Sequence, residues 1–371
     1  MVLSIRSCIM PLTEAAVRAE LAQIIDPNTG CDLVAGHAVR AVGVDGQNAA
    51  VSLQLAYPAK SEHADLVEQV SERLKHQLGV LAVSVEISTR IPAHIVQKEL
   101  SPLPGVRNII AVASGKGGVG KSTTAVNLAL ALVAEGAAVG ILDADIHGPS
   151  IPMMLGISGK PDSLDGKTVE PKSAHGLQAM SIGLFLSEDT PTIWRGPMTT
   201  QYLQQLLTTS NWRDLDYLII DLPPGTGDIQ LTLAQRIPVS AAIIVTTPQD
   251  IALIDAKKAL KMFEKVEVPV LGIIENMATH ICSHCGHADE IFGAGGGAAM
   301  AEQYGTELLG QLPLLRSIRE QADCGVPTVA AAPESAEAGI YRAIARRAAA
   351  KLSLQARNKS IGFPNIVIQN T

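Results

Sequence analysis

One stretch of the chain combines glycines, two lysines and a serine at a spacing that can bind phosphate. It runs Gly115-Lys116-Gly117-Gly118-Val119-Gly120-Lys121-Ser122, and it matches the pattern G-x-x-x-x-G-K-[S/T] at every fixed position. Glycines let successive backbone N–H groups converge on phosphate oxygens. Lys121 is then expected to reach the β- and γ-phosphates, and the Ser122 hydroxyl to help hold Mg²⁺. This stretch, the phosphate loop, predicts a nucleotide site that Thr123 completes.

Carboxylates follow two apolar runs farther along the chain. The run 139–142 is followed by Asp143 and Asp145, and the run 217–220 by Asp221. Ligands of parallel sheets collect at the carboxyl ends of the strands, so we expect Asp143 and Asp145 to project there together. A carboxylate at the position of Asp221 can bind Mg²⁺ directly or through water. These residues predict phosphoryl chemistry beside the phosphate loop.

Cys282 and Cys285 form a C-x-x-C pattern with His284 inside it and His287 after it. A thioredoxin-like redox pair has this pattern at a helix N-terminus in a different fold. A structural zinc ion needs four ligands, which the two thiolates and the histidines could nearly supply. A four-iron cluster takes four thiolates, of which one chain supplies two and a two-fold dimer all four. The residues alone leave these alternatives open.

The elements that must position these residues alternate in type. Apolar runs of strand length are followed by stretches whose apolar residues recur at helical spacing. The predicted strands are 108–114, 139–145, 217–221, 241–246 and 270–274, and the predicted helices are 123–135 and 250–265. This alternation indicates an α/β fold with a mostly parallel sheet covered by helices on both faces. The phosphate loop lies between the first of these strands and the first helix, as its function requires.

Residues 1–90 predict a separate small α/β domain with the element order α-β-β-α-β. The predicted elements are a helix 14–25, strands 38–44 and 49–57, a helix marked by Leu66, Val70, Leu74 and Leu78, and a strand 81–87. Prolines in the segment 91–106 indicate a linker. We therefore predict a nucleotide-binding domain at 107–360 and a tail at 361–371.

Lys116 makes the phosphate loop similar to the deviant phosphate loop of the dimeric ATPases related to the Min, Par and nitrogenase-iron-protein groups. In those families the early lysine reaches the partner's nucleotide, so the resemblance implies a homodimer around two bound ATP molecules. The stretch 143–150 resembles their first switch, which implies that Asp145 orients the attacking water. An asparagine at the place of Asn276 hydrogen-bonds the adenine there, and an amide suits a purine edge.

Five motifs occur in one order between residues 115 and 293, namely G-K-G-G-V-G-K-S, D-A-D-I-H-G-P-S, D-L-P-P-G-T-G-D, I-E-N-M and C-S-H-C-G-H ending in I-F-G. That order resembles the Mrp/ApbC family of ATP-dependent iron–sulfur cluster carriers. The front domain is similar to the small domain of iron–sulfur assembly factors, with Asp-Pro-Asn in place of its usual Asp-Pro-Glu.

The resemblance implies a slow ATPase whose Cys282 and Cys285 hold a 4Fe-4S cluster between two protomers. It also implies scaffold proteins as cluster donors and apo iron–sulfur proteins as recipients. The alternative is a Min/Par-type positioning ATPase in which the cysteine pair holds structural zinc. Arg195, in a W-R-G-P-M motif of the carrier ATPases, and Cys31 receive no assigned role.

Composition limits the possible partners and locations. Of the 371 residues, 47% are hydrophobic and 18% charged, which indicates globular rather than disordered structure. The net charge of −7 argues against nucleic acid as the main partner, because DNA binders usually carry a basic field. No apolar run approaches the roughly 20 residues of a membrane-spanning helix, and the N-terminus lacks the apolar core of a signal peptide. We expect a cytoplasmic protein.

The C-terminal part contains one more amphipathic stripe. Ile340, Ile344, Ala348 and Leu352 recur at helical spacing, with basic residues such as Lys351 nearby. A basic amphipathic helix can bind a membrane surface. Because this stripe is narrow and lacks Trp and Phe, we expect the helix to pack on its own domain with a solvated basic face and no stable membrane association.

Overall fold

The computed structural model describes residues 12–94, 96–97, 100–146, 148–185, 196–282 and 284–355. The chain divides into two compact units, Met1–Ile91 and Pro92–Thr371. Some residues of the motifs and segments described above lie outside the described residues, namely His147, Trp194, Arg195, Ser283 and the segment 356–371.

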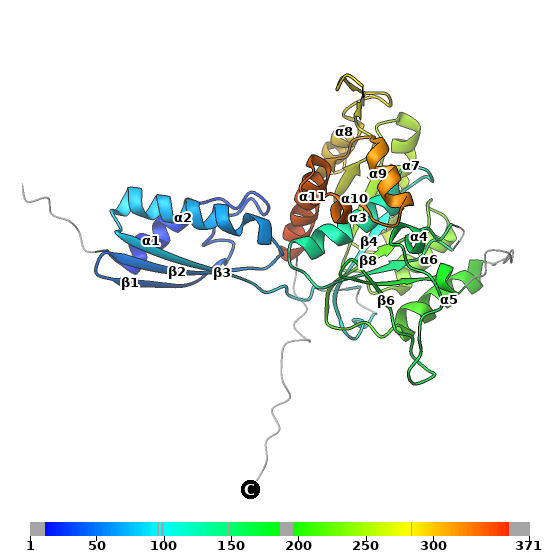
Figure 1. Ribbon diagram of the computed structural model, residues 1–371, viewed down its shortest axis with the longest axis horizontal. Helices are drawn as coiled ribbons and strands as arrows, with labels where there is room; N and C mark the ends of the chain where they lie inside the picture. Colours follow the sequence, from blue (N-terminus) through cyan, green and yellow to red (C-terminus); the bar gives the residue numbers. More distant parts are fainter. Residues whose placement is uncertain are drawn as a thin grey trace, which may run out of the picture. The chain divides into compact units, whose positions relative to one another are not determined.

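The first unit is a three-stranded sheet with both helices on one face (Figure 1). Its elements are α1 (Glu14–Leu21), β1 (Val39–Asp45), β2 (Asn48–Leu55), a 3₁₀ turn (Lys60–Glu62), α2 (His63–Leu78) and β3 (Ala82–Thr89). Strand β2 lies in the middle, antiparallel to β1 and parallel to β3. Alternate residues of β2 are buried, as a strand with one covered face requires. This is the predicted α-β-β-α-β order.

Helix α1 ends earlier than predicted, at Leu21 instead of residue 25. A short turn follows, and the chain then pairs with a later segment, in which the backbone N–H of Leu33 donates to the carbonyl of Ile24 at 3.1 Å. The Asp26 carboxylate accepts the backbone N–H of Asn28 at 2.9 Å, which forms a local turn. These alternative partners for the backbone end the helix, although the apolar spacing continues.

The second unit is built on an eight-stranded sheet, counted over the described residues, with strand order β13-β10-β9-β4-β8-β5-β7-β6. Its strands are β4 (Val106–Ala113), β5 (Val139–Asp143), β6 (Lys172–Ala174), β7 (Leu177–Ser181), β8 (Leu215–Asp221), β9 (Ala241–Thr246), β10 (Val270–Glu275) and β13 (Leu308–Gln311). Neighbouring strands are parallel except β6, which is antiparallel to β7. The predicted mostly parallel sheet is confirmed.

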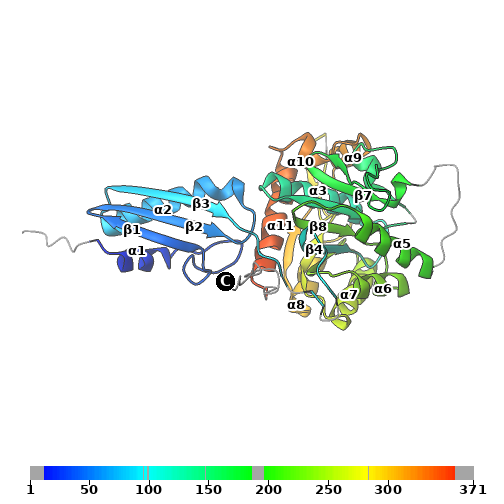
Figure 2. The ribbon, with the colours of Figure 1, turned by 90° about the horizontal axis from the view of Figure 1, so that it is seen from below.

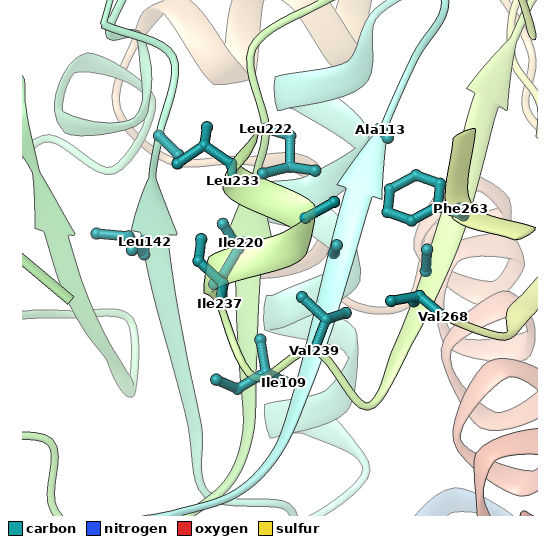
Figure 3. Close-up of a cluster of buried hydrophobic side chains, with 14 of the residues drawn as sticks. Ile109, Ala113, Leu142, Ile220, Leu222, Leu233, Ile237, Val239, Phe263 and Val268 are labelled. Carbon is teal, nitrogen blue, oxygen red and sulfur yellow. The ribbon is translucent and has the colours of Figure 1, made fainter. Parts of the chain in front are cut away.

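Helices cover both faces of this sheet, with α3, α10 and α11 on one face and α5, α6, α7 and α8 on the other (Figure 2). The helices are α3 (Lys121–Ala134), α4 (Ile151–Met154), α5 (Gly196–Thr209), α6 (Asp228–Arg236), α7 (Asp250–Lys265), α8 (Gly296–Gln303), α9 (Arg316–Asp323), α10 (Thr328–Ala331) and α11 (Ala336–Ser353), with a 3₁₀ turn at Ile182–Leu184. Side chains of β4 and β8, such as Ile109 and Ile220, face Leu233 of α6 and Phe263 of α7 (Figure 3). This buried apolar layer fixes the strand ends that carry the functional residues.

Helix α11 packs on its own unit, as predicted, with Ile344, Ala348 and Leu352 buried. Its basic face is not solvated as expected, because three of its cations bind groups of the same unit. These contacts are Arg346 Nη1 to Glu135 Oε1 at 2.7 Å, Arg347 Nη1 to the Leu309 carbonyl at 2.8 Å and Lys351 Nζ to Glu307 Oε1 at 3.0 Å. Within the described residues, no helix is long and apolar enough to span a membrane.

Candidate nucleotide and cysteine sites

The phosphate loop connects the end of β4 to the start of α3 and depends on its glycines for separate reasons. Gly118 and Gly120 have φ of 82° and 79°, a left-handed conformation that glycine adopts without strain. A Cβ on Gly115 would lie 2.1 Å from the backbone carbonyl carbon of Asp255 in α7. A Cβ on Gly120 would lie 2.2 Å from Nδ2 of Asn276. The loop is therefore shaped by its own backbone and by two close neighbours.

Three hydrogen bonds fix the loop in place. Asn276 Nδ2 donates to the Val119 carbonyl at 2.8 Å, and Ser114 Oγ donates to the Lys116 carbonyl at 3.0 Å. The backbone N–H of Gly225 donates to the Ser114 carbonyl at 2.9 Å, which attaches the P-P-G-T-G segment to the loop. The Lys116 side chain is exposed. Asn276 lies against the loop, and its contact with adenine stays a prediction.

Lys121 and Asp221 form a buried ion pair beside the loop. Lys121 Nζ lies 2.5 Å from Asp221 Oδ1, and the two side chains are only 6% and 0% exposed. Burial raises the pKa of Asp221, although Lys121 opposes this effect. Oδ2 of Asp221 is buried and has no hydrogen-bond partner in the described structure. A buried carboxylate oxygen without a donor suits a cation, so Asp221 and the half-buried Ser122 fit the predicted Mg²⁺.

The two carboxylates after β5 differ in their surroundings. Asp143 is fully buried, and its Oδ2 accepts the Ser181 hydroxyl at 3.0 Å and the Ile151 N–H at 3.2 Å. Its Oδ1 accepts the backbone N–H of Asp145 at 3.1 Å. The expectation that both carboxylates project together is wrong, because Asp143 binds groups inside the protein while Asp145 is half-exposed. Asp143 thereby holds both ends of the segment 145–151, a positioning role that the sequence pattern did not reveal.

We expect the nucleotide-free protein to lose stability as the pH rises from about 4 to about 7 because of Asp143. Burial, with repulsion from Asp221, raises the pKa of Asp143 from 3.8 to about 7. The folded state then binds more protons than the unfolded state between these values, so the free energy of unfolding falls by up to about 1.4 kcal/mol per pH unit. Urea unfolding at several pH values should show a shallower decline for Asp143→Asn. An unchanged slope would contradict this assignment.

The cysteine pair lies in the turn of a hairpin formed by β11 (His280–Ile281) and β12 (Ala288–Asp289). Cys282 is half-buried, Cys285 is exposed, and neither is in a disulfide. The Cys282 N–H donates to the His287 carbonyl at 2.9 Å. Hydrogen bonds from the backbone N–H groups of Cys285 and His284, and then from the Cys285 thiol, lower the pKa of Cys282. A thiol that ionises more readily is a better ligand for iron or zinc.

The hairpin geometry bears on the alternatives for the cysteine pair. The pair lies in a hairpin turn and not at the helix N-terminus that a thioredoxin-like redox pair requires. In the part of the chain that the structure describes, neither His284 nor His287 joins the two thiols in a group of three metal ligands. One chain thus presents the two thiols as a pair.

Comparison with models of known protein families shows to which family the chain belongs. Residues 105–349 match the family model described as "ParA: NUBPL iron-transfer P-loop NTPase". Residues 14–87 match the model of an iron-sulfur cluster assembly protein. The chain belongs to the NUBPL-type iron-transfer P-loop NTPases. This match confirms the resemblance to the cluster-carrier ATPases and does not favour a Min/Par-type positioning ATPase.

The printed names of individual relatives of this iron-transfer NTPase agree with the family assignment. The iron-sulfur cluster carrier protein of Escherichia coli K12 is 53% identical over 342 residues, which is 92% of this chain and 93% of the relative. The iron-sulfur cluster transfer protein NUBPL of Mus musculus is 49% identical over 253 residues, 68% of this chain and 79% of the relative. A nucleotide-binding protein from Archaeoglobus fulgidus, solved in complex with ADP, is 39% identical with a TM-score of 0.54, over 60% of this chain and 87% of that one.

Proposed function

We propose that this protein is an ATP-hydrolysing carrier that binds an iron–sulfur cluster and transfers it to apoproteins. The observation that carries the proposal is the exposed hairpin with two free thiols, one of lowered pKa, in the same unit as a complete phosphate loop. The names of the relatives, cluster carrier and cluster transfer protein, support it. The cluster is cargo, bound and released, and ATP is the substrate.

ATP chemistry is assigned to five side chains around the phosphate loop. Lys121, beside Asp221, binds the β- and γ-phosphates, and Asp221 with Ser122 would hold Mg²⁺, which would supply positive charge at the phosphates. Asp145 orients the attacking water, and Lys116 reaches the nucleotide of the partner subunit. Hydrolysis to ADP and phosphate then depends on positioning and charge neutralisation. We expect slow turnover, because hydrolysis serves a conformational step.

The proposed cluster site needs two copies of the chain. A 4Fe-4S cluster takes four thiolates, and Cys282 with Cys285 supplies two from each protomer. The role proposed for Lys116 also needs a second copy, since its proposed target is the partner's nucleotide, and its side chain is exposed. Both arguments support a homodimer. Scaffold proteins as donors, apo iron–sulfur proteins as recipients and a cytoplasmic location, without nucleic acid or stable membrane partners, complete the proposal.

Anaerobic reconstitution with iron and sulfide tests the carrier function. We expect about four irons and four sulfides per wild-type dimer, and none above background in the double variant Cys282→Ala/Cys285→Ala. Cys324→Ala is the matched control, because Cys324 is also a free, exposed cysteine but lies outside the hairpin. The loaded wild type should activate an apo-enzyme that requires a four-iron cluster.

Two results would contradict the carrier function. The first is a wild type that binds no cluster under these conditions and retains zinc, which would make the cysteine pair structural. The second is a double variant that binds as much iron and sulfide as the wild type, which would place the cluster elsewhere.

Wild type and double variant should hydrolyse ATP at similar basal rates before reconstitution, because the cysteines do not lie in the phosphate loop.

A further inference from the structure

A short segment joins the phosphate loop directly to the cysteine hairpin. This connector, Asn276–Ile281, begins at the carboxyl end of β10 and leads without interruption into Cys282. At its start, Asn276 Nδ2 lies 2.8 Å from the Val119 carbonyl oxygen. A Cβ on Gly120 would lie 3.7 Å from Cε of Met277, so the Met277 side chain also lies against the loop. The loop and the connector are therefore in contact through two consecutive side chains.

Backbone hydrogen bonds keep the connector extended beyond this contact. Its neighbour is the segment 312–314, which follows β13. The Ala278 N–H donates to the Leu312 carbonyl at 3.0 Å, and the Leu314 N–H donates to the Thr279 carbonyl at 2.8 Å. The ring nitrogen Nδ1 of His280 lies 3.1 Å from the Leu314 carbonyl oxygen. A segment held in this way transmits a displacement to the hairpin that a flexible loop would absorb.

The backbone departs from regular geometry at one place in the connector. Met277 has φ of 57°, a left-handed conformation that side chains other than glycine adopt at a cost. The residue before Asn276 is held firmly, since the fully buried Glu275 accepts hydrogen bonds from the Gly297 N–H and from Gln311 Nε2. The strained residue thus lies between a fixed strand end and the cysteine hairpin, and it is one of the two residues whose side chains lie beside Gly120.

The predicted phosphate ligand Lys121 lies directly beside this contact in the sequence. Lys121, the residue after Gly120, forms an ion pair with the buried Asp221. The phosphates that the loop pattern assigns to Lys121 would therefore bind next to Gly120, which lies against Asn276 and Met277. Any shift of the loop is therefore applied to the start of the connector.

We propose that the connector couples the two sites, with Asn276 and Met277 as positioning residues that transmit nucleotide binding to Cys282 and Cys285. The proposal rests on the cluster-carrier function, to which it adds the physical path between ATP and cargo. Nucleotide binding changes the position and exposure of the thiols, and with them the hold on the cluster. Because coupling between two binding sites is reciprocal, occupation of the thiols changes nucleotide affinity by the same factor.

Alkylation of the cluster-free protein tests the coupling. The rates at Cys282 and Cys285 are measured by peptide mass spectrometry with iodoacetamide, with and without a saturating non-hydrolysable ATP analogue and Mg²⁺. We expect a change of about fivefold in the wild type, the lower end of typical coupling between sites. Cys31, which lies in the other compact unit, is the internal reference and should not respond.

Two substitutions at one position separate coupling from folding. Met277→Gly removes the side chain that touches Gly120 and suits a left-handed backbone, so the fold is retained. We expect its nucleotide response to fall below about twofold, whereas Met277→Leu keeps an apolar side chain of similar volume and most of the response. A wild type without any response at saturating nucleotide, or a full response in Met277→Gly, would overturn the proposal.

One further readout separates loss of coupling from loss of dimerisation. Sedimentation of wild type and Met277→Gly with the analogue compares their association. A lost response with unchanged association supports the coupling, and a response that disappears only together with dimerisation overturns it. Because no cluster is present in the alkylation experiment, its outcome is independent of reconstitution, so that failure of the carrier function and failure of the coupling are distinguishable.

Discussion

Replacing Lys121 by methionine is expected to lower ATP hydrolysis by about a thousandfold, since a cation aimed at the transferred phosphoryl group is lost. The same change should destabilise the nucleotide-free protein by about 3 kcal/mol, because it leaves the buried carboxylate of Asp221 without its cation. Phosphate release reports the first effect and urea unfolding the second. Methionine matches the length of the lysine stem, so that the loss of charge dominates both effects.

A second substitution separates these two effects. In the double variant Lys121→Met/Asp221→Asn the buried charge is gone as well, so most of the lost stability should return. ATP hydrolysis should not recover above the level of the single variant, because the phosphate and Mg²⁺ ligands are both missing. If Lys121→Met retained more than about a tenth of the wild-type rate, Lys121 would not be the main phosphate ligand that the loop pattern predicts.

The sequence predicts those parts of the fold that depend on neighbouring residues. Strand β9 (Ala241–Thr246) and helix α7 (Asp250–Lys265) have the predicted bounds. Strand β9 is a short, almost continuous apolar run, and the apolar residues of α7 recur at helical spacing over the whole element. The conformation of the phosphate loop also depends on neighbouring residues, since eight consecutive residues specify the turn and the start of α3. The resemblance to the cluster-carrier ATPases supplied the family, and the comparisons confirm it.

The contacts that position the site join residues far apart in the chain, and no local pattern predicts them. Asn276 binds the loop carbonyl of Val119 across 157 positions, and Lys121 pairs with Asp221 across 100. The different surroundings of Asp143 and Asp145 show most clearly what a local sequence pattern does not predict. The rule that residues i and i+2 share a face holds only within a strand, and β5 ends at Asp143, so that Asp145 takes a different direction.

The ion pairs of the basic face of α11 could not be predicted from the local sequence either. A run of arginines at helical spacing is consistent with solvation and with ion pairing, because the partners lie on other elements. Here Glu135, which follows α3, and Glu307, which precedes β13, provide them. Packing of α11 could be predicted from its apolar stripe, whereas the partners of its charges could not.

The role of Lys116 across a dimer interface can be tested by complementation between two inactive chains. Lys116→Ala and Asp145→Asn should each lower hydrolysis by about a hundredfold as homodimers, since each removes one positioned group from both sites. In a mixed dimer, the site on the Lys116→Ala chain keeps its own Asp145 and receives Lys116 from the partner. The other site lacks both groups. We therefore expect a mixed dimer isolated with two different tags to regain about half of the wild-type rate, because one of two symmetric sites is restored.

The same mixed dimer gives the opposite result if Lys116 acts within its own chain. One site then lacks Lys116 and the other lacks Asp145, so that neither is complete and the rate stays at the level of the homodimers. The exposed side chain of Lys116 is compatible with either geometry, whereas its backbone is held by Ser114. A double variant carrying both changes in one chain, paired with a wild-type chain, is the control. It should retain little activity if Lys116 acts across the interface, since each site then lacks one group, and about half if it acts within the chain.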